Sequence, residues 1–484
     1  MWSRIQGHLR LITEYQLMAK GIRRSEILVS LQRGIRVPLR VQLERALRDA
    51  IQRGRLAAGC QLPSTRVLAS ELDLSRGLVV AVYEQLVAEG YLCAHRGSST
   101  SVANRATTPR RVMQRETQTL RVPRYDLRPG RPDHALFPRR AWSSALRRTL
   151  ATAPDAALDY PDAQGAASAR VVLATYLNRS RATAAIADQI VFSTGFAQGI
   201  RLVCETLKAR GVRRLAVEDP GHAFESGEIR ASGLTIVPVP VDGSGLCVER
   251  LAHLNVRGVY VTPAHQYPLG VVLSAERRAA LLAWADQRDG FIVEDDYDGE
   301  YRYDREPIGA LQGLAPERVV YIGSSSKTLA PALRIGWVLS PSSLIPGLSK
   351  AKLDADRGSP ALDQLTLAEF IERGHLDRHL RRTRLIYSRR RALLATAIRT
   401  HLPGYSIRGI AAGLHLTLDL PRGADEAVIV REAGGRGIAL HGLGSYRSRP
   451  NAGQPALLLG YCRLPESDIN EAARALAAVI KRRE

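Results

Sequence analysis

Lysine is scarce in this chain of 484 residues. Only six of its 69 Lys and Arg residues are lysines, so its basic surface is built from arginine. The five cysteines are scattered and form no CxxC pair, which argues against a zinc site and a disulfide framework and favours a reducing compartment. No stretch approaches the ~18 consecutive apolar residues of a membrane span, and the N-terminus lacks the apolar core of a signal peptide. We therefore expect a soluble cytoplasmic protein without a membrane partner.

The length exceeds what one hydrophobic core supports, so two or three domains are expected. The formal net charge is +22, and it is unevenly distributed. Residues 1–125 carry 21 Lys and Arg against 9 Asp and Glu, whereas residues 126–484 carry 48 against 38. A basic N-terminal part favours binding to the phosphate backbone of a nucleic acid. The alternative is a generally arginine-rich composition, which would raise the charge along the whole chain.

A helix-turn-helix is predicted near the front of the chain. Ser64 and Ser75 each stand directly before a short apolar helix, where a serine acts as N-cap, and a turn of three to four residues separates the two helices. An earlier helix is predicted to end near Gly54. Residues 91–94 and 99–102 predict two short strands that form a wing.

The stretch LPSTRVLASELDLSRGLVVAVYEQLVAEGYLCAHRGSSTSVA resembles the winged helix-turn-helix of GntR-type bacterial regulators. In that family the PSTR segment, the SR pair of the recognition helix and the wing carry the DNA contacts. The resemblance therefore implies a DNA-binding domain at residues 37–102 with double-stranded DNA as partner. The residues that it places at the DNA are Ser64, Thr65, Arg66, Ser75, Arg76, Gly77 and Gly97.

Two basic segments flank this module. Residues 1–36 form an extension with seven Lys and Arg against two Glu and no regular apolar period, and we assign it no function. Residues 103–125 hold six arginines, one glutamate and two prolines, which is typical of an exposed linker. Such a linker acts as a spacer, or lets paired DNA-binding domains reach half-sites at variable separation.

Short apolar runs alternate with helical patterns in residues 126–484. This βα alternation predicts a mainly parallel sheet covered by helices. After Leu344 the pattern becomes helical and then includes the strand-like GLHLTLDL and PALLLGYC, which predicts a second, smaller domain. The predicted strands of the large sheet are residues 189–194, 215–218, 235–241, 258–262, 291–295, 319–323 and 335–339.

The ends of these strands carry groups that complement one another. Lys327 follows a buried strand, where open α/β sheets hold ligands, and its amine suits a Schiff base with an aldehyde cofactor. Asp295 would keep a ring nitrogen of that cofactor protonated, and Tyr297 would donate to its phenolic oxygen.

A cofactor phosphate needs backbone amides at a helix start together with hydroxyl or guanidinium donors. The turn at residues 194–198 supplies the helix start, and Ser324, Ser326 and Arg334 supply the donors. His222, at another strand end, offers a flat ring to cover the cofactor. Each group alone fits an ordinary loop, but four strand ends that supply parts of one site are hard to obtain by chance.

Residues 126–484 resemble the type I aminotransferase fold, and residues 37 to about 475 resemble the MocR/GabR group of GntR regulators. The segments that carry the resemblance are LRPGRPDHALFP, TGFAQG, EDPGH, TPAHQYPLG, VEDDYDGEYRYD, SSSKTLAPALRIGW and LLLGY. The implied fold class is multidomain, with a winged helix-turn-helix, mainly α with a β wing, joined to an α/β fold type I domain. The large subdomain would span about 155–345 and the smaller α+β subdomain about 346–484.

The resemblance implies that Lys327 forms the internal aldimine with pyridoxal 5'-phosphate, with Asp295 on the pyridine nitrogen and Tyr297 on the phenolic oxygen. Tyr267 stands where aminotransferases have an asparagine, a departure typical of the regulators that counts against turnover. No metal is implied. The further cofactor positions are Gly195, Phe196, His222, Ser324, Ser326, Arg334 and Tyr160, the last from the partner subunit of a head-to-tail homodimer, while Arg447 and Arg449 lie near the expected site of an effector carboxylate.

Three functions remain open. The leading one is a transcriptional regulator, dependent on pyridoxal 5'-phosphate, that senses an amine, an amino acid or a vitamin B6 ligand and shifts the arrangement of paired DNA-binding domains. The second is an active class I/II aminotransferase whose front domain only localises it. The third is a DNA-binding protein whose large domain has lost its cofactor. The retained lysine, aspartate, tyrosine and arginine argue against this third function.

Overall fold

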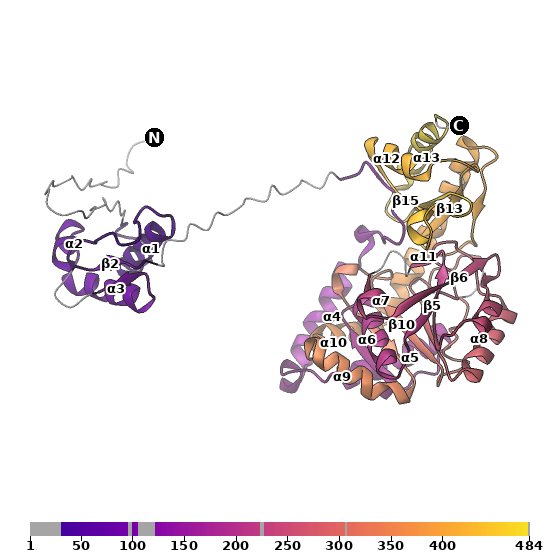
Figure 1. The fold of residues 1–484 in the computed structure, drawn as a ribbon, viewed down its shortest axis with the longest axis horizontal. Coiled ribbons are helices and arrows are strands. Elements are labelled where there is room, and N and C mark those ends of the chain that lie inside the picture. Colours follow the sequence, from indigo (N-terminus) through magenta and orange to yellow (C-terminus); the bar gives the residue numbers. More distant parts are fainter. Residues whose placement is uncertain (1–30, 95–98, 105–121, 223–226, 305–306, 483–484) are drawn as a thin grey trace. The chain divides into compact units, whose positions relative to one another are not determined.

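The computed structural model describes residues 31–94, 99–104, 122–222, 227–304 and 307–482. The chain divides into two compact units, Met1–Leu120 and Arg121–Glu484 (Figure 1). This division falls inside the segment that the sequence predicts as a linker. Of the helices within the described ranges, none combines the length and the apolar content needed to cross a bilayer.

The first unit contains the predicted winged helix-turn-helix. Its strands β1 and β2 pair antiparallel, with Leu92 opposite Val102. Leucine and valine side chains from all three helices close a small core, which includes Leu43, Leu68 and Val79. The elements of this unit are α1 (Leu39–Gln52), α2 (Thr65–Glu71), α3 (Arg76–Ala88), β1 (Leu92–Cys93) and β2 (Ser101–Val102).

Both predicted serine caps are confirmed. The Ser64 hydroxyl accepts a hydrogen bond from the Val67 amide at 3.3 Å, and the Ser75 hydroxyl accepts one from the Leu78 amide at 3.2 Å. Each bond satisfies an amide that the first turn of the helix leaves without a partner. The caps therefore define where α2 and α3 begin.

Replacing Ser75 with alanine is expected to destabilise the start of α3 by about 0.5–2 kcal/mol, because the capping acceptor is lost. Hydrogen exchange of the full chain without DNA should show faster exchange of the α3 amides. Ser70→Ala, an exposed position within α2, serves as control. Equal α3 exchange rates in the two variants would contradict the capping role.

An eight-stranded sheet forms the centre of the second unit. Its strand order is β4-β11-β10-β9-β8-β5-β6-β7, and all seven predicted strands are present. The strands are β4 (Ile190–Ser193), β5 (Arg214–Asp219), β6 (Thr235–Asp242), β7 (Gly245–Leu246), β8 (Gly258–Val261), β9 (Phe291–Asp295), β10 (Val319–Ser324) and β11 (Gly336–Leu339).

The prediction of a mainly parallel sheet holds for its centre, since β10, β9, β8, β5 and β6 run parallel. Two strands depart from this direction: β7 pairs antiparallel with β6 at one edge, and β11 runs antiparallel to both β10 and β4. The connection between β10 and β11 holds no long helix, and a parallel return needs a crossover of a dozen or more residues. The segment that contains Lys327 is therefore a tight return at the carboxyl end of β10.

Helices cover both faces of this sheet (Figure 1). Alternate residues of each strand point to opposite faces. Val191 and Val320 accordingly pack with α6 and α9, whereas Phe192 and Tyr321 pack with α4, α5 and α10. The helices are α4 (Arg139–Thr152), α5 (Ala167–Arg181), α6 (Phe196–Ala209), α8 (Ala275–Gln287), α9 (Ile345–Asp356) and α10 (Ala361–Glu372).

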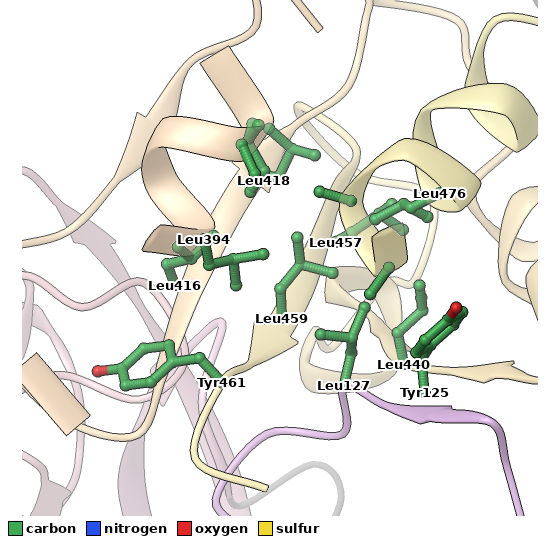
Figure 2. Close-up of a cluster of buried hydrophobic side chains, with 14 of the residues drawn as sticks. Tyr125, Leu127, Leu394, Leu416, Leu418, Leu440, Leu457, Leu459, Tyr461 and Leu476 are labelled. Carbon is green, nitrogen blue, oxygen red and sulfur yellow. The ribbon is translucent and has the colours of Figure 1, made fainter. Parts of the chain in front are cut away.

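The smaller subdomain holds a four-stranded antiparallel sheet in the order β12-β13-β16-β15. Figure 2 shows its core, in which Tyr125 and Leu127 lie beside Leu457 and Leu476. The first residues of the unit thus pack with its last. The elements are β3 (Tyr125–Asp126), α11 (His375–His401), β12 (Ile407–Arg408), β13 (His415–Asp419), α12 (Glu426–Gly435), β14 (Ile438–Ala439), β15 (His441–Gly442), β16 (Ala456–Gly460) and α13 (Glu466–Ile480).

Candidate functional site

Lys327 lies three residues after β10, at the carboxyl edge of the sheet. Its Nζ donates a hydrogen bond to the carbonyl oxygen of Gly130 at 2.7 Å. Gly130 has a φ of +66°, and a Cβ at this position would lie 3.2 Å from that Nζ. A side chain other than hydrogen would therefore be both strained and crowded here. The segment that follows the linker thus reaches the lysine directly.

Asp295 is the last residue of the neighbouring strand β9 and is buried. Its Oδ2 accepts a hydrogen bond from the Tyr260 hydroxyl at 2.6 Å. Among the described residues, no Lys, Arg or His nitrogen forms an ion pair with it. Burial raises the pKa of Asp295 to about 6. The site therefore holds a buried carboxyl group that has no ion-pair partner among the described residues, while the charges of His222 and Lys327 act on it from further away and lower its pKa.

Tyr297 follows two residues later. Its hydroxyl lies 2.9 Å from Nδ1 of His265, in the loop after β8, and its ring contacts Tyr267 edge-on with centroids 5.5 Å apart. Burial raises the pKa of Tyr297 well above its usual value. The phenol therefore stays protonated at neutral pH and can act as a hydrogen-bond donor.

The turn from β4 into α6 is held by an arginine from another strand end. Arg334 Nη2 donates to the carbonyl oxygen of Thr194 at 2.5 Å. Gly195, the residue before α6, has a φ of +85°, and a Cβ there would lie 3.0 Å from the Arg334 guanidinium carbon. The approach of Arg334 to the start of α6 thus needs glycine. A guanidinium beside free helix amides is a setting that binds phosphate.

The remaining predicted cofactor residues surround these groups. Ser324 and Ser326 flank Ser325, whose hydroxyl is buried and donates to the Ile335 carbonyl. The His222 ring lies 5.7 Å from that of Phe196, between centroids, and 5.8 Å from that of Tyr267. These ring contacts continue to Tyr260 and Tyr297. The loops that carry Lys327, Asp295, Tyr297, Arg334, Phe196 and His222 therefore meet at one edge of the sheet.

Three predicted residues remain, Tyr160, Arg447 and Arg449. Tyr160 is 85% exposed in the chain. Arg449 is exposed, whereas Arg447 is half-buried and donates Nη2 to the Gln454 carbonyl oxygen at 2.7 Å. Burial lowers the pKa of Arg447, and within the described ranges no carboxylate forms an ion pair with it. Arg447 is thus better placed than Arg449 to accept a carboxylate.

Several contacts of the site were missed from the sequence. Tyr260, which holds Asp295, lies in the otherwise apolar strand β8, and a phenol there was the available signal. Lys352 is fully buried and donates to Gln198 Oε1 at 2.7 Å, and the same oxygen accepts from the Thr194 amide at 2.8 Å. The scarcity of lysine indicated Lys327 but not Lys352, which supports the turn between β4 and α6 through Gln198.

The predicted DNA-contacting residues gather at the starts of α2 and α3. Five of them are exposed at these helix starts, Thr65 is half-buried, and Gly97 lies outside the described residues. Exposed side chains at the first turn of the second helix are those that reach base edges in helix-turn-helix proteins. The exposed residues are Ser64, Arg66, Ser75, Arg76 and Gly77.

Both parts of the chain match known families. Residues 39–102 match the bacterial regulatory proteins of the gntR family, and residues 126–430 match aminotransferase class I and II. The second unit is similar in structure to Pyrococcus horikoshii kynurenine aminotransferase, with a TM-score of 0.67 and 26% identity over 74% of this chain and 90% of that chain. It is also similar to an archaeal alanine:glyoxylate aminotransferase, with a TM-score of 0.68 and 26% identity over 74% and 91%.

The relatives that span both parts are regulators. The probable rhizopine catabolism regulatory protein MocR of Rhizobium meliloti is 32% identical, over 92% of this chain and 94% of that protein. The pyridoxine biosynthesis transcriptional regulator PdxR of Corynebacterium glutamicum is 34% identical, over 84% of this chain and 88% of that protein. This supports a regulator rather than an active aminotransferase. The chain belongs to the MocR-type transcriptional regulators of the GntR family, in which a DNA-binding helix-turn-helix domain precedes a domain of the aminotransferase class I and II fold.

Proposed function

We propose that this regulator binds pyridoxal 5'-phosphate at Lys327 and senses an amine, an amino acid or a vitamin B6 compound through it. The observation that carries the proposal is the buried carboxyl group of Asp295, which has a phenol but no cation within ion-pair distance among the described residues. A protonated pyridine nitrogen would supply that cation. When bound, the cofactor supplies an aldehyde carbon that exchanges amines.

The residues of the chain have separate roles in this proposal. Lys327 holds the aldehyde carbon covalently, Asp295 holds the proton of the ring nitrogen, and Tyr297 donates to the phenolic oxygen. The amides at the start of α6 and the guanidinium of Arg334 bind the phosphate, since Arg334 already lies against this turn. The residues assigned to the rest of the cofactor surface are Gly195, Phe196, Ser324, Ser326 and the ring-covering His222.

The effector carboxylate is assigned to Arg447. This guanidinium is half-buried, its pKa is lowered by burial, and it donates to the backbone carbonyl oxygen of Gln454. An arginine removed from water without an acid gains more from a carboxylate than the exposed Arg449 does. The hydroxyl of the neighbouring Tyr446 accepts a hydrogen bond from the Tyr267 hydroxyl at 2.9 Å and so connects this loop to the cofactor cluster.

A homodimer completes the proposed site. Tyr160 and the nearby Leu158 are 85% and 69% exposed, and large apolar side chains exposed side by side mark interaction surfaces. In a head-to-tail dimer, Tyr160 of one subunit would reach the phosphate of the other. The paired winged domains at residues 37–102 would bind double-stranded DNA, and the linker at 103–125 would connect them to the sensing domain at 126–484.

Titration of the purified protein with pyridoxal 5'-phosphate tests the proposal, with Asp295→Asn as the decisive variant. The affinity is expected to fall by roughly 10- to 100-fold, because a charge-assisted hydrogen bond of about 1.5–3 kcal/mol is lost. The visible absorbance of the bound cofactor is the measurement. Unchanged affinity would contradict the role of Asp295.

Asp295→Asn is expected to weaken cofactor binding but to stabilise the cofactor-free fold at high pH. Burial raises the pKa of Asp295 from 3.8 to about 6, so its contribution to stability is present below about pH 4 and is lost as pH rises through about 6. Asp295→Asn should therefore unfold at a higher temperature than the parent at pH 8. Glu294→Gln is the matched control, since Glu294 is equally buried on β9 and its pKa is raised to about 7, but it accepts from the amides of residues 311 and 312. That control should bind the cofactor within about twofold of the parent, because Glu294 lies outside the proposed site.

A further inference from the structure

Next to Tyr297 lies a buried pair whose place in the site is not explained by cofactor contacts. Nδ1 of His265 lies 2.9 Å from Asp298 Oδ2 and also 2.9 Å from the Tyr297 hydroxyl. The side chains of His265 and Asp298 are only 4% and 2% exposed. One ring nitrogen therefore faces both a carboxylate and the phenol that is proposed to contact the cofactor.

The pair comes from two adjacent loops. His265 follows β8 and Asp298 follows β9, and these strands are parallel neighbours, so their loops leave the same edge of the sheet. The smaller subdomain covers the pair at Gly413, which has a φ of +71°. A Cβ at Gly413 would lie 2.2 Å from Cε1 of His265 and 2.5 Å from Oδ2 of Asp298. Only glycine leaves room for the pair at this close packing of the two subdomains.

The position of one proton decides what the Tyr297 hydroxyl can do. If Nδ1 of His265 carried no proton, it would place a lone pair against the Asp298 carboxylate, and the Tyr297 hydroxyl would donate to Nδ1. If Nδ1 is protonated, it donates to Asp298 in a charge-assisted hydrogen bond, and the Tyr297 oxygen can only accept from it. The second arrangement is favoured, because a buried carboxylate without a donor costs several kcal/mol. The hydroxyl proton of Tyr297 then points away from Nδ1, and because the Nδ1–H occupies the Asp298 carboxylate, it competes with the interaction between the Tyr297 hydroxyl and Asp298.

A second imidazole packed against the pair does not disturb this arrangement. His415 on β13 packs with its ring 5.6 Å from that of His265, between centroids. Burial lowers the pKa of His415 to about 3, so this imidazole is neutral at physiological pH. Its Nε2 meets the Pro268 carbonyl oxygen at 3.0 Å, and it therefore brings no charge to the pair.

We propose that His265, held by Asp298, is a positioning residue that directs the hydroxyl proton of Tyr297 toward the phenolic oxygen of the cofactor. The proposal rests on the cofactor function proposed above. A donor to that oxygen stabilises its deprotonated, negatively charged form. His265 would thereby lower the pH at which the bound chromophore loses its proton, without touching the cofactor itself.

The test is a pH titration of the visible absorbance of the cofactor-loaded protein. His265→Leu removes the Nδ1 donor, and the Tyr297 proton is then free to turn to Asp298. The absorbance midpoint should rise by about one pH unit, a tenfold change in proton affinity. His265→Asn places an amide N–H near the former Nδ1 and should keep the midpoint within about 0.3 units of the parent. If His265→Leu does not fold, His265→Gln provides the same test, because its longer amide leaves the Nδ1 position empty.

A double variant separates positioning from general damage. In a Tyr297→Phe background, which itself raises the midpoint, His265→Leu should add no further shift, because the hydroxyl through which it acts is gone. Tyr321→Phe is the structural control: it deletes another buried hydroxyl, which donates to Asp296 at 2.8 Å on the other side of the loop. This control should lower the unfolding temperature and leave the midpoint unchanged.

The outcomes are distinct. A midpoint that stays the same or falls in His265→Leu, with the chromophore bound, would overturn the proposal, as would a full further shift in the Tyr297→Phe background. Equal midpoints for the Leu and Asn variants would also overturn it. A parent protein that acquires no absorbance band would instead refute the cofactor function on which the proposal rests.

Discussion

Replacing Lys327 with alanine is expected to abolish the visible absorbance of the protein after incubation with pyridoxal 5'-phosphate. Lys327 is the only lysine that the fold places at the carboxyl edge of the sheet beside Asp295 and Tyr297 among the described residues. An alanine cannot form the covalent bond, so the loss should be complete rather than graded. Borohydride reduction followed by mass spectrometry of the peptides should label Lys327 in the parent and nothing in the variant.

Lys350→Ala is the matched control for this experiment. Lys350 lies on α9, is exposed, and pairs with Asp354 at 2.8 Å one helical turn away. Its loss should cost little stability, since exposed ion pairs of this kind contribute about 0.3–0.5 kcal/mol. The control should retain the full absorbance band. A labelled peptide other than that of Lys327 in the parent would contradict the assignment.

Replacing Arg76 with alanine is expected to weaken binding to the promoter next to the gene by about 1–3 kcal/mol, which is about 5- to 150-fold. Arg76 is exposed at the first position of α3, directly after the capping Ser75. In this position its side chain can reach a base edge while the helix amides face the phosphate backbone. Fluorescence anisotropy at several salt concentrations measures both the affinity and its salt slope.

Arg45→Ala provides the control for charge alone. Arg45 is exposed on α1, outside the turn between α2 and α3. Its loss should change the affinity much less than the loss of Arg76, and equally for specific and nonspecific DNA. If both variants bind the promoter as the parent does, the placement of the recognition helix at residues 76–88 is wrong.

The winged helix-turn-helix and the large sheet were predictable because their signals are local. Serine caps, helical apolar spacing and short buried runs depend on a few neighbouring residues, and the structure confirms α2, α3 and the seven strands. The reversal of β11 was not predicted, because an apolar run has the same pattern in either direction. Direction depends on the length of the connection and on the neighbour that the strand finds.

In the candidate site, too, some residues were predictable from local sequence and others were not. Lys327, Asp295 and Tyr297 could be named from the sequence, because each lies at, or within three residues after, the end of a strand that the apolar pattern predicts. Their supporting contacts could not, because each joins distant parts of the chain. Gly130 accepts from Lys327 although 197 positions separate them in the sequence, and Lys352 donates to Gln198 although 154 positions separate them.

The sequence by itself determined which chemical groups stand at the strand ends, including the lysine that is conspicuous in an arginine-rich chain, and the resemblance of both parts to regulators of the GntR family. Only the tertiary structure decided that Asp295 accepts from Tyr260 and has no ion-pair partner among the described residues, and that Nδ1 of His265 lies beside both Tyr297 and Asp298. The physical reason is that these arrangements depend on strand order and on the packing of the two subdomains. Burial and proton positions follow from that packing, so they cannot be predicted from a local pattern of residues.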